Sequence, residues 1–196
     1  AVLLTPRTPV DLLFHGMVTL DLFGAYCRLL FAALGVLMAL GAAAYLRREE
    51  LPHGEFHALL LFATAGMNFM VTGADLVMTF VGLEILSIAT YVLAGFRRRD
   101  PRSNESGMKY FFMGAFSSAI LLYGIALIYG AAGSTNYGAV RRFMAGFSNL
   151  SELPLMLALG IGLVVVGFSF KVAAAPFHVW TRSEEHTSEL QSRQVI

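Results

Sequence analysis

Residues 76–96 read LVMTFVGLEILSIATYVLAGF, a continuous apolar run in which Glu84 is the one charged side chain. A run of this length matches the roughly 30 Å of hydrocarbon that a membrane helix has to cross. A soluble helix would carry a polar stripe along one side, whereas this stretch is apolar all round. The segment therefore predicts a transmembrane helix with a carboxylic acid inside it.

Four further stretches have the same apolar character and are predicted spans, at residues 26–46, 55–71, 108–129 and 153–179. The span at 55–71 is the weakest, because it is short and carries polar side chains. Only residues 72–74 separate it from the next span, so the two should form an antiparallel helical hairpin. The mixed pattern at 137–147 predicts a short interfacial helix. We expect an all-α, polytopic transmembrane helix bundle of about five spans.

The composition excludes several other classes of protein. The chain is 57% hydrophobic and 14% charged, with a mean hydropathy of +0.66, which is far from an ordinary soluble domain. The single Cys27 excludes an internal disulfide, and no Cys/His cluster has the spacing of a metal site.

Both ends of the chain look cut. It begins at Ala1 without Met, and residues 1–10 lack the basic region and cleavage site of a signal peptide. The composition changes abruptly at Arg182, and residues 182–192 (RSEEHTSELQS) resemble the in-frame translation of a sequencing-adapter oligonucleotide. We expect residues 182–196 to be a non-native, disordered tail; the alternative is a genuine polar cytoplasmic tail.

Arginines gather in two short segments, after the first span and after the third. They are Arg47, Arg48, Arg97, Arg98, Arg99 and Arg102. Two crossings separate the segments, so both face one side of the membrane, which the positive-inside rule assigns to the cytoplasm. Arg141 and Arg142 would then lie outside, which is the one feature of the arginine distribution that disagrees with this orientation.

Three ionisable side chains lie inside or at the edge of the spans: Glu84, Lys109 and Lys171. A charge at the bilayer centre costs at least ~3 kcal/mol, so such residues usually face a bundle interior or a water-filled path. A carboxylate alone in apolar surroundings protonates, and a nearby cation keeps it ionised. The charge of Glu84 should therefore be switchable. Lys109 lies at the first turn of its span, where a lysine commonly snorkels to the interface.

Lys171 directly follows an unbroken apolar run and precedes Pro176, which frees the carbonyl of Val172 from its helical bond. Broken helices at membrane depth are typical of ion sites in transporters, so Lys171 is expected to handle protons. His178 titrates in the neutral range and is a further candidate. As a straight helix, this span would place Lys171 about 12 Å deeper than Glu84, so direct pairing needs a shift, tilt or break of the helix.

Several ordered motifs resemble one family, subunit N of the bacterial NADH–quinone oxidoreductase, respiratory complex I. They are residues 82–87 (GLEILS), 105–118 (ESGMKYFFMGAFSS), 122–135 (LYGIALIYGAAGST) and 170–180 (FKVAAAPFHVW). The similarity covers roughly residues 11–181. It implies a 14-helix fold with two inverted five-helix repeats and broken helices, of which the present spans match the third to seventh. Residues 1–181 would then be a partial antiporter-like transmembrane domain.

By resemblance, Glu84 corresponds to the family's fifth-helix glutamate and Lys171 to its seventh-helix lysine, the pair thought to govern proton movement. Lys109 and His178 match further polar positions. The implied function is proton translocation driven by quinone reduction, as a subunit of an oxidoreductase in the bacterial inner (cytoplasmic) membrane. The implied partners are other membrane subunits of the complex and the lipid bilayer, with no nucleic acid. The complex would handle quinone, and flavin and iron–sulfur clusters would reside in partner subunits, with no cofactor in this chain.

Two other classes of function remain open. The first is a subunit of a multisubunit cation/proton antiporter, whose large subunits share the glutamate–lysine design. The second is a purely structural membrane subunit in which the ion pairs are fixed.

Overall fold

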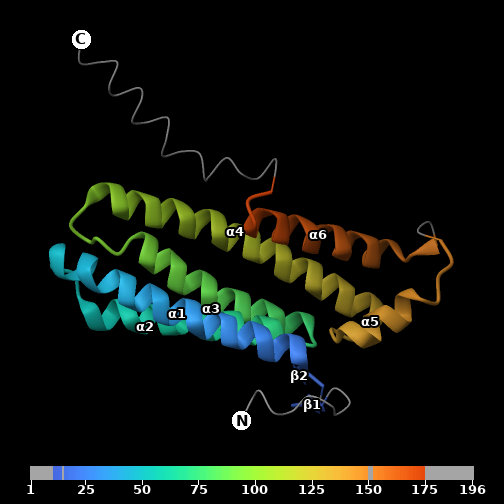
Figure 1. Ribbon diagram of the computed structural model, residues 1–196. Coiled ribbons are helices and arrows are strands. Elements are labelled where there is room, and N and C mark those ends of the chain that lie inside the picture. The colour runs from blue at the N-terminus through green and yellow to red at the C-terminus, as the bar shows by residue number, and fades with distance from the viewer. Residues whose placement is uncertain (1–10, 15, 150–151, 175–196) are drawn as a thin grey trace.

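The computed structural model describes residues 11–14, 16–149 and 152–174, which form a helical bundle with a small β-hairpin at one end (Figure 1). The elements are β1 (Asp11–Leu13), β2 (Val18–Leu20), α1 (Leu22–Arg48), α2 (His53–Thr72), α3 (Leu76–Ala94), α4 (Pro101–Ala132), α5 (Tyr137–Met144) and α6 (Leu155–Lys171). The two strands pair antiparallel, with Leu12 opposite Thr19.

Each of the five predicted spans is a helix, and the predicted interfacial helix is α5. By length and composition, three helices in the described residues can cross a membrane, namely α1, α3 and α4, whereas α6 is apolar but has 17 residues. The β-hairpin was not predicted; its second strand bridges to Gly73 at the end of α2.

Two predicted boundaries were wrong. Helix α4 begins at Pro101 instead of at residue 108, because Asp100 caps it by accepting from the backbone N of Arg102 at 3.0 Å and Pro101 suits the first helical position. Helix α6 ends at Lys171, and residues 172–174 are not helical; the rest of the predicted span, residues 175–179, lies outside the described residues. The next residue is Val172, whose carbonyl would meet the ring of Pro176 if the helix continued.

Glycines set how closely the helices approach. A Cβ on Gly66 of α2 would lie 2.6 Å from the carbonyl oxygen of Gly82 on α3, and one on Gly124 of α4 would lie 2.8 Å from that of Gly160 on α6. Gly160 therefore lets α6 pack closely on α4. At Gly162 a Cβ would meet no atom of the described chain within 4 Å, so this glycine faces outward.

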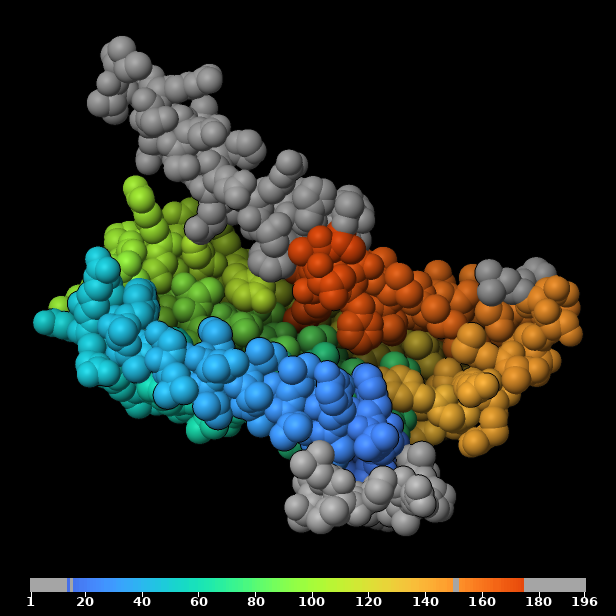
Figure 2. Space-filling model, viewed as in Figure 1, coloured from blue at the N-terminus to red at the C-terminus, as the bar shows by residue number. Residues whose placement is uncertain are grey.

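The core lies where α3, α4 and α6 meet, and its buried residues are Leu76, Leu83, Leu121, Ile125, Ile128 and Leu157. Helix α1 packs on α2 and runs along the face shown in Figure 2. Only 6% of its most apolar window is buried, so most of its side chains are left for lipid or for other protein. This exposure is what a membrane-embedded helix requires and a soluble one avoids.

The two arginine-bearing segments lie at the same end of the bundle. Arg97 contacts Glu49 at 2.7 Å, and Arg98 pairs with Glu55. The sequence-based expectation that these segments share one side is thus confirmed. At the opposite end, the backbone N of Leu76 donates to the carbonyl of Thr135 at 3.0 Å, which ties the start of α3 to the segment after α4.

Candidate functional site

One face of α3 carries three polar side chains in register. Glu84, Ser87 and Tyr91 follow the spacing i, i+3, i+7, which places them above one another on a single side of the helix. Ser87 and Tyr91 are 5% and 6% exposed, and the side chain of Glu84 is 24% exposed. An otherwise apolar helix therefore presents a polar strip to the interior of the bundle.

Lys171, the last residue of α6, points its ammonium group at this strip. Nζ donates to Oε1 of Glu84 at 3.4 Å, to Oγ of Ser87 at 3.1 Å and to Oη of Tyr91 at 3.0 Å. The lysine side chain is only 10% exposed. An ammonium group has three N–H donors, so these three acceptors satisfy it completely.

The depth difference between the two charges disappears because α6 is offset from α3. The hydroxyl of Ser117 on α4 donates to the carbonyl of Gly167 at 3.1 Å, and its neighbour Ser118 contacts Glu84, so Gly167 and Glu84 lie at the same level. Gly167 is twelve residues into α6 and Glu84 eight into α3, which makes the offset about 6 Å at 1.5 Å per residue. The remaining ~6 Å from Gly167 to Lys171 is spanned by the lysine arm, which leans towards the start of its own helix.

Glu84 has a second, neutral partner. The hydroxyl of Ser118 on α4 lies 2.6 Å from Oε1 of Glu84 and 2.9 Å from the carbonyl oxygen of Gly114. Because a serine hydroxyl has one proton, it can donate to only one of these two acceptors at a time. The contact with Ser118 is shorter than the 3.4 Å contact with Lys171. The ion pair is thus loose, and each charge also has uncharged hydrogen-bond partners. Such a pair can open without leaving either charge unsatisfied, which is the costly outcome in a buried site.

Tyr91 is held in place by the backbone of α4. A Cβ on Gly114 would lie 2.0 Å from the hydroxyl oxygen of Tyr91, so only glycine leaves room for this side chain. The ring packs edge-on against Tyr110, with centroids 4.7 Å apart, and Nζ of Lys171 lies 5.6 Å from the Tyr91 centroid. The hydroxyl is therefore fixed by its surroundings and does not depend on the lysine for its position.

The chain turns sharply immediately after Lys171. The backbone N of Ala173 donates to the carbonyl of Phe170 at 3.1 Å and that of Ala174 to Ser169 at 2.8 Å, while Ala173 has a φ of 51°. These bonds form a Schellman motif with alanine at the left-handed position that glycine usually occupies. The turn places Lys171 at the very end of α6, where its bonds satisfy the carbonyls of Ser169 and Phe170.

The chain resembles known proteins in a consistent way. Residues 73–188 match the family model described as NADH:quinone oxidoreductase/Mrp antiporter, TM. This chain belongs to that family. The matched segment contains the described α3, α4 and α6, and with them the whole of the Glu84–Lys171 site. It also runs into residues 182–188, whose composition indicates a non-native tail, so the boundary at residue 181 stays a prediction.

Individual members of the NADH:quinone oxidoreductase/Mrp antiporter family agree with this assignment. NADH-quinone oxidoreductase subunit N of Trichlorobacter lovleyi is 45% identical over 86% of this chain. Among solved structures, respiratory complex I from Thermus thermophilus with bound aureothin matches 92% of this chain and 37% of its own chain, at 34% identity and a TM-score of 0.69. The Mrp complex from Dietzia sp. DQ12-45-1b matches 83% of this chain and 29% of its own, at 26% identity and a TM-score of 0.60. The chain spans about a third of the length of the curated relatives it matches.

The other two predicted site residues are not brought to the ion pair within the described part of this family member. Lys109 pairs with Glu105 one turn earlier on α4, and its side chain is 62% exposed. Its predicted interfacial character agrees with this exposure. His178, like Pro176, lies outside the described residues. Sequence reasoning missed Ser87 and Tyr91 as partners of Lys171 and Ser118 as a partner of Glu84; the i, i+3, i+7 spacing from Glu84 could have identified the first two.

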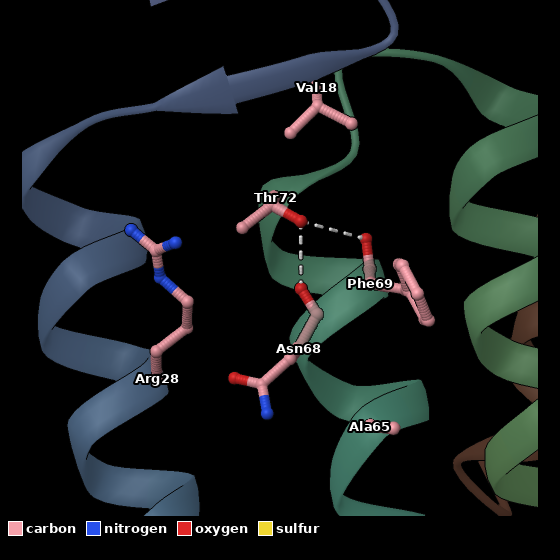
Figure 3. A pocket seen from close by; sticks show the side chains of 6 residues that line it. All are labelled: Val18, Arg28, Ala65, Asn68, Phe69 and Thr72. Atoms are coloured by element: carbon pink, nitrogen blue, oxygen red, sulfur yellow. Dashed lines mark hydrogen bonds between the residues drawn. The ribbon is translucent and has the colours of Figure 1, made fainter. Parts of the chain in front are cut away.

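Arg28 is a further cation in an apolar span, and the sequence pattern had not singled it out. Its Nε donates to the carbonyl of Gly24 at 3.2 Å, so it reaches back towards the start of α1. It borders a hollow of about 330 Å³ between α1 and α2 (Figure 3), lined also by Val18, Ala65, Asn68, Phe69 and Thr72. Neither Glu84 nor Lys171 lines this hollow, so it is distinct from the ion-pair site.

No group of three or more His, Cys, Asp or Glu side chains that could hold a metal ion occurs in the described ranges. The site itself offers one carboxylate, one ammonium group and three hydroxyls. Such a set can hold and move protons.

Proposed function

We propose that this chain is part of a membrane subunit of the proton-pumping NADH–quinone oxidoreductase and that Glu84 and Lys171 lie on its proton path. The names of its subunit N relatives and the likeness to a complex I chain support this proposal. The observation that carries it is the contact between Nζ of Lys171 and Oε1 of Glu84 at 3.4 Å, inside a bundle whose helices are otherwise apolar.

The proposed mechanism uses the looseness of this pair. With the pair closed, the carboxylate stabilises the protonated lysine. When a charge change in a neighbouring part of the complex draws Glu84 away, Ser118 remains as its donor, and the lysine loses its charged partner. The protonated form of Lys171 is then less favoured, and its proton can pass to water in the bundle. Closing the pair favours uptake of the next proton.

In this proposal the chain carries out no redox chemistry. Flavin and iron–sulfur clusters reside in partner subunits, and quinone is reduced elsewhere in the complex. The neighbours of this chain are other membrane subunits and lipid, in the bacterial inner membrane, and Lys109 and His178 are placed on the same path. Residues 1–181 form the antiporter-like part, and residues 182–196 a non-native tail.

A second candidate is a subunit of a cation/proton antiporter. The family description covers Mrp antiporters, and the Mrp complex from Dietzia sp. DQ12-45-1b matches at a TM-score of 0.60. The lower identity of that match, 26% against 34% for the complex I chain, favours the oxidoreductase.

The test uses the full-length subunit in its assembled complex, with proton uptake and NADH oxidation measured in membrane vesicles. Lys171→Ala and Glu84→Gln should each reduce proton uptake per NADH at least tenfold, and Glu84→Asp should be milder because it keeps the charge. The double variant should be little worse than either single one, since residues that act as a unit are not additive.

Lys109→Ala is the comparison variant, because it removes a second lysine proposed for the path whose side chain is 62% exposed and pairs with Glu105 instead of Glu84. It should cost less than Lys171→Ala. Detection of the variant subunit in the purified complex confirms that each variant assembles. Normal pumping by Lys171→Ala would refute the proposed path and leave the structural-subunit alternative standing.

A further inference from the structure

The ion pair leaves two contacts of Lys171 unexplained, namely those with the uncharged hydroxyls of Ser87 and Tyr91. Both are shorter than the contact with Glu84, at 3.1 Å and 3.0 Å against 3.4 Å. A lysine that only needed a counter-ion would place its ammonium group against the carboxylate. Here the ammonium group sits further along α3, closer to the two hydroxyls.

The hydroxyl of Tyr91 is positioned independently of the ion pair. Tyr91 is 6% exposed, and its ring is confined between Tyr110 and the α4 backbone at Gly114. Opening of the pair does not remove this constraint, so the tyrosine continues to offer its oxygen to Nζ. Nζ lies 3.0 Å from Oη and 5.6 Å from the ring centroid, so it contacts the tyrosine at its hydroxyl and not over the face of the ring.

Few other ionisable groups of the described chain face this site from the helices packed against it. On α3 the further group is Glu84, and on α4 it is the phenol of Tyr110. Lys109 and Glu105 on α4 pair with each other and are mostly exposed. Lys171 is the one charged residue within α6. Within the described chain, the ammonium group of Lys171 therefore has a small set of ionisable neighbours, of which Tyr91 is the nearest.

We propose that Tyr91 is a positioning residue that, together with Ser87, holds the ammonium group of Lys171 on α3 when the pair with Glu84 opens, and so sets the pH range over which this lysine carries a proton. The inference rests on the proposed function and adds to it the group that determines the working pH. The carboxylate of Glu84 is the contact that Lys171 gains and loses as the pair closes and opens. The hydroxyl of Tyr91 is the contact that Lys171 keeps in both states.

The test is Tyr91→Phe in the full-length subunit within the assembled complex. Phenylalanine keeps the ring and its packing and removes only the acceptor. The protonated lysine then loses one of three acceptors, so it should lose its proton at a lower pH. The alkaline limb of proton uptake per NADH should move to lower pH by about one unit, the order expected for one hydrogen bond to a charged group. Tyr123→Phe is the matched control on α4, where the side chain is 61% exposed.

A second variant, Ser87→Ala, tests the same proposal if Tyr91→Phe assembles poorly. Ser87→Ala removes the other neutral acceptor and should move the limb in the same direction. An unchanged pH profile in both variants, with pumping lost in Lys171→Ala, would overturn the role of Tyr91 and leave the proposed function intact. Normal pumping by Lys171→Ala would refute both the role of Tyr91 and the proposed function.

Discussion

Gly114→Ala tests whether the position of the Tyr91 hydroxyl matters, without touching the tyrosine itself. The added Cβ would lie 2.0 Å from Oη, 2.4 Å from Cζ and 2.8 Å from Cε1 of Tyr91. Non-bonded carbon atoms are normally about 3.5–4.0 Å apart, so the ring has to retreat by at least about 1 Å. The ring has no free space to enter, because it is 6% exposed and packs on Tyr110.

The size of the effect follows from this geometry. Overpacking of this kind typically costs about 1–3 kcal/mol. A displacement of about 1 Å is also enough to break a 3.0 Å hydrogen bond to Lys171, since such bonds weaken steeply beyond their normal range. We therefore expect a complex that loses activity at a lower temperature and whose alkaline limb of pumping lies at lower pH.

The assay compares Gly114→Ala with Gly162→Ala, in the full-length subunit within the assembled complex. Gly162 is also in a helix, and its Cβ would meet nothing within 4 Å among the described residues. This control should be neutral or slightly stabilising, since alanine is the better helix former by about 1 kcal/mol. Heat inactivation and the pH profile of proton uptake are measured for both. Indistinguishable behaviour of the two variants would refute the claim that α4 positions Tyr91.

Two further predictions concern orientation and the end of α6. The orientation is tested in a variant without Cys27, with a single cysteine introduced at His53 or at Ser148, both of which are exposed. The cysteine at His53, at the arginine-rich end, should react with a membrane-impermeant reagent only from the cytoplasmic side, and the one at Ser148 only from outside. The opposite pattern would reverse the orientation. Ala173→Gly should raise the temperature of heat inactivation slightly, because Ala173 has a φ of 51° and the left-handed region costs a non-glycine residue about 1 kcal/mol; a lower temperature would contradict the Schellman turn.

Local sequence information was sufficient for the helices. Apolar runs of near-membrane length predicted all five long helices, and the arginine distribution predicted that the segments after α1 and α3 share one end of the bundle. These properties depend on hydropathy and on the number of crossings, which a linear sequence contains. Boundaries were less certain, because capping decides them. Asp100 and Pro101 extend α4 beyond its apolar run, and the turn at residues 172–174 ends α6 at Lys171.

Glu84 and Lys171 could be identified from the sequence because a charged side chain in an apolar span costs free energy, so such residues are rare and usually functional. Their contact could not be predicted, because it depends on the offset of about 6 Å between α3 and α6. That offset is set by where Gly124 meets Gly160 and where Ser117 meets Gly167, both of which are contacts between helices distant in the chain. The spacing from Glu84 could have placed Tyr91 on the same face of α3, but its contact with Lys171 could not be predicted, because the hydroxyl fits there only where Gly114 on another helix leaves room for it. The sequence alone thus determined which charges enter the membrane, and tertiary packing decided which groups surround them.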